Sequence, residues 1–373
     1  MKRTNEAISS TVDRRSRARG TETTKKPRED TSPLAAASFP LLVYDHGEQL
    51  DNSQIALSVA DGSSRTYQLP EMRNSRCLET PQGLVLIIDN ASFHCSLWNP
   101  QTGERTPLPA MEKAPPQYCR CLISDTGSSP PPWVTDGAAP PEPLVLVCDL
   151  ARPELLFCRI RGGGAWVRQP YDMGRYEIPG FPPTVRTIHE MAVLMGMFFF
   201  LHPGEEAVGA LVSFAGGDDP EPRHLGFPGF DAPLPTLHRK EEMKELTATK
   251  SYLLESNREL ILVRIMFVVG TALERIEEVG AYVMDFAEHR WRRVVGIGDA
   301  AFLLGPDGFA ASCPAAEHGL KEGCVYFACD DLGDSNDVHV FDLKDGTREL
   351  VRPAQDMPVL SRKPFWLVPP VLP

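Results

Sequence analysis

Short apolar runs bounded by Gly, Pro, Asp and Asn fill the chain from Phe39 onward. This pattern is typical of many short β-strands. Six segments repeat one motif, in which a strand leads to a turn and a second strand leads out toward a Leu or Val. They are Ile55–Leu69, Cys95–Leu108, Leu155–Val167, Ala210–Leu225, Ala281–Val295 and Val338–Leu350. Turns such as Asp61-Gly62 favour hairpins, because Gly adopts positive φ freely and Asp tolerates it.

Further apolar runs lie between the hairpins and give each unit a buried inner strand. They are Leu84–Ile88, Leu144–Cys148, Ala192–Leu201, Leu260–Ile265 and Cys324–Cys329. Repeated sheets of about four strands predict an all-β fold, a β-propeller of six or seven four-stranded blades, because radial closure leaves no long unpaired edge. Pro364–Val368 is placed to pair with a strand near Leu41–Tyr44 and so to join the last blade to the first.

The hairpin turns are unevenly spaced along the chain, which predicts two exposed insertions. Ser124–Pro143 is rich in Pro, and Phe227–Lys250 combines a Pro-rich stretch with the charged run Arg239–Lys244. The charged run has the composition of one or two exposed helical turns. Because loops on a rigid scaffold often carry recognition, the insertions are candidate binding surfaces.

The first 38 residues differ from the rest of the chain. They lack aromatic residues and are rich in Arg, Lys, Thr, Ser and Glu, so they cannot bury enough apolar area to offset the entropy of ordering. We therefore predict a disordered basic tail over residues 1–38 and one propeller domain over residues 39–373. Two basic clusters, Arg14–Arg19 and Lys25–Arg28, are compatible with a nuclear-import signal.

Charge and cysteine content narrow the function classes. The tail holds nine Lys/Arg and five Asp/Glu, whereas the rest holds 29 basic and 45 acidic residues, so an acidic body argues against general nucleic-acid binding. Nine Cys without paired spacing predict free thiols in a cytoplasmic or nuclear protein. The longest apolar run, Met191–Leu201, is well short of the ~20 residues of a membrane helix, and we expect no membrane association.

Two stretches of sequence resemble a known family. Ser96–Pro109, with the sequence SLWNPQTGERTPLP, is similar to a hairpin of the propeller domains that accompany plant F-box proteins. The C-terminal third resembles, in order, the plant KIB-type β-propeller family of F-box-associated domains, most of all its grass members. The matching segments are Tyr282–Phe286, Trp291–Val294, Ile297–Leu304, Gly319–Lys321, Cys324–Phe327 and Val340–Leu343. The resemblance covers roughly residues 40–370.

This resemblance implies a non-catalytic protein-interaction propeller, like the substrate-recognition part of F-box proteins in ubiquitin ligases. Many members begin with an F-box, a helical motif of about 45 residues that docks the ligase adaptor and needs an amphipathic pattern. The residues before Phe39 lack that pattern. We therefore expect at most the receptor half of such a ligase, with a protein partner and without F-box docking of the adaptor.

The sequence predicts no catalytic, cofactor-binding or metal-binding residue. Cys119 with Cys121, and Cys324 with Cys329, lack the spacing of a structural zinc site and are expected to be free thiols. An acidic cluster lacks the Gly and the distal Glu of a calcium loop, and we assign it to an exposed loop. Its members are Asp330, Asp331, Asp334 and Asp337.

The remaining motifs also favour structural roles. His189 and His202 flank an apolar run without forming a metal-binding pair, and no G-x-S-x-G elbow or phosphate loop occurs. Gly296-Ile297-Gly298 is too short for a dinucleotide fingerprint. Trp98, Trp166 and Trp291 occur in their hairpins where an indole fills the space between neighbouring blades.

Two functions from different classes follow. The first is a protein-interaction propeller that recognises its partner on one face of the disc. The alternative is an enzyme or small-ligand-binding propeller with a site at the central channel. Convergent carboxylates, His or Arg in the channel would favour the alternative, whereas an apolar or backbone-lined channel would not. A decayed family member that binds nothing is a third reading.

Overall fold

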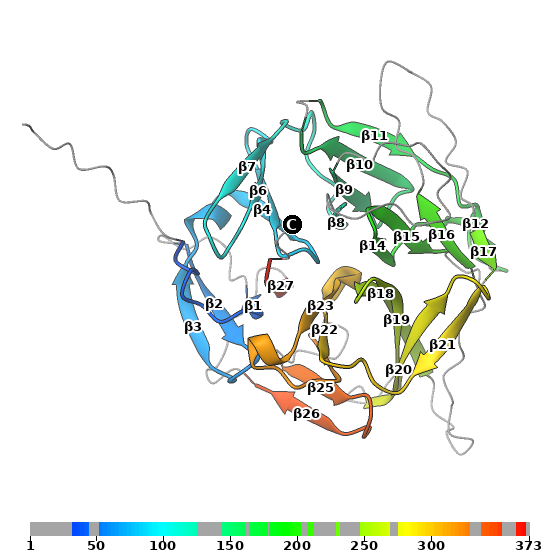
Figure 1. Cartoon of the computed structure of the whole chain (residues 1–373). Helices are drawn as coiled ribbons and strands as arrows, with labels where there is room; N and C mark the ends of the chain where they lie inside the picture. Colours follow the sequence, from blue (N-terminus) through cyan, green and yellow to red (C-terminus); the bar gives the residue numbers. More distant parts are fainter. Residues whose placement is uncertain are drawn as a thin grey trace, which may run out of the picture. The chain divides into compact units, whose positions relative to one another are not determined.

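The computed structural model describes eleven ranges, all within the compact unit Thr31–Pro373. They are residues 32–44, 52–124, 143–161, 164–177, 179–202, 207–211, 229–231, 247–268, 275–328, 337–352 and 363–370. These residues form six radially arranged sheets (Figure 1). The predicted β-propeller is confirmed, with six blades.

Blade 1 combines strands from both ends of the unit, and blades 2 and 3 follow it in the chain. The strands of each blade are named from the centre outward. Blade 1 contains β27 (Phe365–Leu367), β1 (Leu41–Tyr44), β2 (Ser53–Ser58) and β3 (Ser64–Gln68). Blade 2 contains β4 (Ser75–Glu79), β5 (Val85–Asp89), β6 (Cys95–Trp98) and β7 (Arg105–Leu108). Blade 3 contains β8 (Cys119–Ile123), β9 (Leu144–Asp149), β10 (Glu154–Arg159) and β11 (Val167–Pro170).

The other three blades follow in chain order. Blade 4 contains β14 (Met191–Leu194), β15 (Met197–Leu201), β16 (Ala207–Leu211) and β17 (Gly229–Asp231). Blade 5 contains β18 (Thr247–Ser256), β19 (Glu259–Val268), β20 (Arg275–Asp285) and β21 (Arg290–Val294). Blade 6 has five strands, β23 (Ala310–Pro314), β22 (Ala300–Leu304), β24 (Cys324–Phe327), β25 (Val338–Asp342) and β26 (Arg348–Val351), and only β22 and β24 run parallel.

A few short elements lie outside the blades. β12 (Arg175–Tyr176) and β13 (Thr184–Val185) form a separate two-stranded sheet. Three 3₁₀ turns occur, η1 (Pro70–Met72), η2 (Pro306–Gly308) and η3 (Ala316–His318). Within the described ranges there is no α-helix, and none of the elements could cross a membrane as a helix.

The predicted closure of the ring by the C-terminal segment is confirmed. β27 pairs antiparallel with β1, with Leu41 opposite Leu367 and Val43 opposite Phe365. Successive residues of a strand point to opposite faces. Trp366 accordingly packs in the core that includes blade 6, whereas Phe365 and Leu367 pack in the core shared with blade 2. One short strand therefore fills the space on both sides of blade 1.

The hydrophobic core lies between neighbouring blades, as the three tryptophans predict. Trp98 packs between blades 1 and 2, and Trp291 between blades 4 and 5. Trp166 packs with residues of blades 2 and 3, and its indole Nε1 donates a hydrogen bond of 2.8 Å to the Pro109 carbonyl. A buried indole with a satisfied N–H stabilises the contact between two blades.

Five of the six predicted hairpins are found where the turns indicate, as β2–β3, β6–β7, β10–β11, β20–β21 and β25–β26. The sixth prediction, Ala210–Leu225, is corrected. β16 pairs with β17, which begins at Gly229, while the predicted turn at Gly216-Gly217 lies outside the described residues. The predicted insertion Phe227–Lys250 therefore contains β17 and the start of β18, and its charged run lies outside the described residues.

One prediction about inner strands is also wrong. Ala192–Leu201 is not one strand, because Met195 and Gly196 both have positive φ and turn β14 back onto β15. The other four runs predicted as buried inner strands are confirmed as β5, β9, β19 and β24, although a further strand lies closer to the centre in each sheet. The centre is lined instead by strands such as β4, whose Arg76 and Glu79 interrupt an apolar pattern because they face a partly charged cavity.

The last residues of the predicted tail, 32–38, are packed against the propeller. Ser32 Oγ donates a 2.6 Å hydrogen bond to the Pro100 carbonyl, and the buried Leu34 lies in the core between blades 1 and 2. Residues 32–38 thus contact the propeller. The rest of the predicted tail, residues 1–31, and the middle of the insertion 124–143 lie outside the described residues.

Candidate functional site

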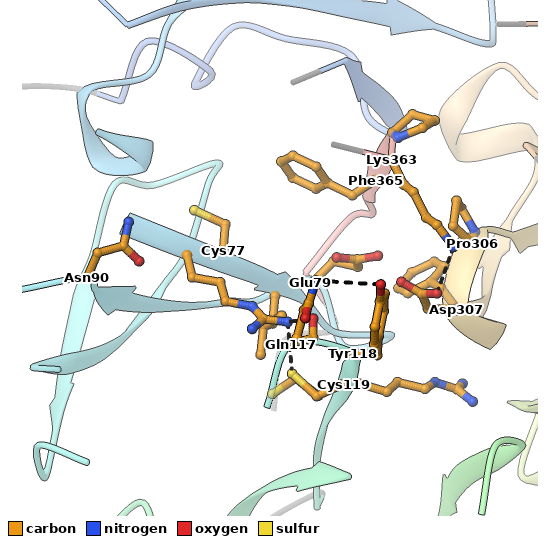
Figure 2. A pocket seen from close by; sticks show the side chains of 16 residues that line it. Cys77, Glu79, Asn90, Gln117, Tyr118, Cys119, Pro306, Asp307, Lys363 and Phe365 are labelled. Carbon is orange, nitrogen blue, oxygen red and sulfur yellow. Dashed lines mark hydrogen bonds and ion pairs between the residues drawn. The ribbon is translucent and has the colours of Figure 1, made fainter. Parts of the chain in front are cut away.

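A cavity of about 470 Å³ lies where the inner strands of several blades meet. Its walls come from β27 of blade 1, β4 of blade 2, β8 of blade 3 and the η2 turn of blade 6 (Figure 2). We call it the axial cavity. Its charged lining residues are Arg76, Glu79, Arg120, Asp307 and Lys363. The lining of the cavity therefore combines these charged side chains with apolar ones such as Leu78, Phe309 and Phe365.

Arg76 connects blade 2 with the segment that leads into blade 3. Its guanidinium donates hydrogen bonds to the carbonyls of Pro116 and Gln117, and Nη2 lies 3.3 Å from Cys119 Sγ. These acceptors fix the position of the guanidinium but carry no formal negative charge. Arg76 therefore brings a positive charge to the wall of the cavity.

Arg120 is the most deeply buried charged group of the lining, with 5% of its surface exposed. Nη1 donates to the His189 carbonyl over 3.2 Å, whereas Nε and Nη2 are shielded from solvent and have no hydrogen-bond partner among the residues that the structure describes. Burial lowers the pKa of Arg120 to about 10, while Glu190 and Glu79 oppose that shift. Arg120 remains charged at neutral pH with two unsatisfied donors.

Glu79 is the titratable carboxyl of the lining. Burial raises its pKa to about 7 and the Asp307 carboxylate adds to the shift, whereas Arg120 and Arg76 act in the opposite direction. The side chain is half-buried. Its charge therefore changes near neutral pH, and the positive excess of the cavity grows when it is protonated.

The rim carries a compensated pair and an aromatic side chain. Lys363 Nζ lies 3.0 Å from Asp307 Oδ1, and both side chains are partly exposed. Tyr118, with 51% of its surface exposed, lines the same cavity (Figure 2). Tyr is enriched in protein interfaces.

The Cys and His residues that the sequence analysis considered as possible ligands do not gather at one site among the described residues. Cys119, Cys121 and Cys324 are buried free thiols, and Cys119 and Cys121 also line the axial cavity. His189 Nε2 lies 2.9 Å from Thr187 Oγ1, and His202 packs against Phe200.

The acidic cluster does not form a site in the described part of the chain. Asp337 pairs with Arg352 at 3.1 Å. Cys329, Asp330, Asp331 and Asp334 lie outside the described residues. Among the described residues, no three His, Cys, Asp or Glu side chains are placed to hold a metal ion.

Sequence reasoning missed the charged residues of the cavity. Arg76, Arg120, Asp307 and Lys363 are far apart in the chain, so no spacing motif connects them. One local signal was present. Arg120 is the single charged residue of β8, between two Cys, and a charge within a buried strand points to a polar environment on one face.

Six blades closed by β27 and β1, with a charged axial cavity, define a β-propeller with a candidate binding site at its centre. The chain belongs to the KIB1-4 β-propeller family, whose model matches residues 56–342. The family expected from the sequence is thereby confirmed. A comparison with curated proteins gives no match.

Solved structures give distant likenesses. Dihydro-heme d1 dehydrogenase NirN is 10% identical, with a TM-score of 0.30, and the match covers 91% of this chain and 76% of that one. YCF48 from Cyanidioschyzon merolae is 9% identical, with a TM-score of 0.27 and coverage of 80% and 92%. The WD40 domain of SCAP from fission yeast is 9% identical, with a TM-score of 0.27 and coverage of 81% and 82%. None of them carries an argument about function.

Proposed function

We propose that this chain is a non-catalytic recognition propeller that binds a protein partner at the mouth of the axial cavity. The observation that carries the proposal is the composition of that mouth. Exposed Tyr118 lines the cavity together with the partly exposed pair of Lys363 and Asp307, above a deeper charged lining. An aromatic anchor with flanking charges is the arrangement that binding hot spots favour.

The family supports a more specific role. KIB-type propellers resemble the substrate-recognition part of F-box proteins, so we propose that the partner is a substrate of a ubiquitin ligase in the cytoplasm or nucleus. In this proposal the propeller holds the substrate and performs no chemistry.

Affinity purification from plant cells tests this role, with Tyr118→Ala compared against Leu350→Ala. Leu350 is an exposed apolar residue on β26, the outermost strand of blade 6, and is a matched control. We expect a specific partner that the wild type and Leu350→Ala capture and Tyr118→Ala loses. Equal capture by all three proteins would contradict binding at the mouth. The ligase adaptor in the captured set would support the ligase role, and its consistent absence would remove it.

The carboxylates and arginines in the channel meet the criterion given above for the alternative, so an enzyme or small-ligand-binding propeller is a second candidate function, and Glu79 supports it. A carboxyl with a pKa of about 7 in a cavity has the properties of a general acid or base. Against it, burial raises the pKa of the neighbouring Cys119 thiol to about 12, which makes that thiol a poor nucleophile. Turnover of any substrate that Glu79→Gln abolishes would favour an enzyme over the recognition module.

A further inference from the structure

The axial cavity contains two guanidinium groups without an acidic hydrogen-bond partner. In the described ranges, Arg76 donates to two backbone carbonyls and a thiol, and Arg120 donates to one backbone carbonyl. Buried or half-buried arginines usually pair with carboxylates, because their charge is poorly solvated there. The hydrogen bonds that hold the two guanidinium groups in place therefore come from uncharged groups, while Glu79 and Glu190 attract Arg120 without bonding to it.

The free edge of Arg120 has a defined geometry. Nε–H and Nη2–H lie on the same edge of the planar guanidinium and point in parallel directions, which matches two oxygens of one carboxylate or phosphate. These two nitrogens are the ones without a partner among the described residues, while Nη1 is fixed by the His189 carbonyl. Both atoms are covered from solvent, so a ligand would bind them only after a side chain of the cavity wall moves aside.

The charges around this edge leave room for an added negative group. At the rim, Lys363 and Asp307 compensate each other. Glu79 faces both arginines, and Glu190 attracts Arg120 from outside the lining. Neither of these two carboxylates makes a hydrogen bond to Nε or Nη2 of Arg120. A ligand oxygen at this edge would therefore break no hydrogen bond of Arg120, and it would be favoured when Glu79 is protonated.

The volume also fits a ligand group. Small-molecule sites usually enclose roughly 300–1,000 Å³, and the axial cavity, at about 470 Å³, lies in that range. We infer that the axial cavity binds an oxyanion, a carboxylate or a phosphate group, through the Nε and Nη2 edge of Arg120 with support from the charge of Arg76. The inference rests on the proposed function, because the protein partner would supply the anion as an acidic or phosphorylated side chain.

Isothermal titration calorimetry on the full chain tests the inference with four probes: inorganic phosphate, citrate, a phosphoserine peptide and its unphosphorylated form. We expect at least one oxyanion probe to bind the wild type with a Kd of about 10 mM or tighter. Stronger binding of the phosphopeptide than of inorganic phosphate would assign the anion to a partner side chain, and the reverse would assign it to a free small molecule. No binding by any probe would overturn the inference.

Variants connect the binding to the two arginines. Arg120→Met should weaken the binding of the oxyanion at least about tenfold, and Arg76→Met should weaken it less, since only charge is lost. Arg292→Met is the control, because it removes one exposed positive charge from β21 outside the cavity. Circular dichroism confirms folding of each variant, and Arg76→Met serves if Arg120→Met does not fold. Equal affinity in the wild type and in whichever arginine variant folds would overturn the inference.

The two proposals fail separately. If Tyr118→Ala loses the partner and calorimetry detects no oxyanion binding, the recognition function stands and the oxyanion site is wrong. If oxyanion binding needs Arg120 and Tyr118→Ala still captures the partner, the oxyanion site stands and protein binding at the mouth of the cavity is wrong.

Discussion

Closure of the ring depends on Trp366, and its replacement gives the sharpest stability prediction. The side chain is 1% exposed, and its Nε1 donates a 2.9 Å hydrogen bond to the Leu304 carbonyl of blade 6. Replacing a buried Trp by Ala costs about 3–5 kcal/mol in transfer and cavity terms. Since single domains are stable by about 5–15 kcal/mol, Trp366→Ala should remove a large part of the free energy of unfolding.

A second variant separates the hydrogen bond from the packing. Trp366→Phe keeps most of the apolar volume and loses the Nε1 donor. The Leu304 carbonyl retains a second donor, the Ala328 N–H at 3.0 Å, so the hydrogen bond should account for only about 1 kcal/mol. We expect the free energy of unfolding to fall in the order wild type, Trp366→Phe, Trp366→Ala.

Urea unfolding followed by far-ultraviolet circular dichroism measures this order, because the signal does not depend on the replaced indole. Phe181→Ala is the control: Phe181 is 71% exposed, and its loss should change stability by less than about 0.5 kcal/mol. A loss in Trp366→Ala no larger than that of the control would refute the role of β27 in closing the ring.

Three further predictions concern the cavity and its surroundings. Gly83→Ala should lower the unfolding midpoint, because Gly83 has a φ of +81° and an added Cβ would lie 2.5 Å from Pro370 Cα. Since burial raises the pKa of Glu79 from 4.5 to about 7, the folded state holds this proton more tightly than the unfolded state does. That stabilisation is complete below about pH 4.5 and is lost as the pH rises through about 7, so unfolding at about pH 5 and pH 8 should show a decline that Glu79→Gln reduces. Brief alkylation with iodoacetamide, read by peptide mass spectrometry, should modify the half-buried Cys77 before the buried Cys119, and the reverse order would contradict the burial.

The sequence predicted the hairpins and the closure because each rests on local chemistry. Asp61-Gly62 and Asp345-Gly346 supply turn residues between two apolar strands, and Gly62 and Gly346 adopt the positive φ expected there. The segment around Trp366 is an isolated apolar run at the end of the chain, which is consistent with a partner strand elsewhere. Local patterns of this kind survive in the fold unchanged.

The strands nearest the centre of the propeller and the charged residues of the cavity were not predicted, for one physical reason. Strands that face the centre border a partly charged cavity on one side, so β4 carries Arg76 and Glu79, whereas the next strand of the blade, β5, is almost wholly apolar. A search for apolar runs passes over such strands. The site itself joins Arg120 and Asp307, which lie on different blades, and only the radial fold brings them together.

A crystal structure of the chain grown with the oxyanion probe that binds most tightly tests the central claim most directly. The account predicts an oxyanion in the axial cavity, with its oxygens within about 3 Å of Nε and Nη2 of Arg120. An oxyanion bound elsewhere, with the guanidinium edge of Arg120 still unpartnered, would contradict it.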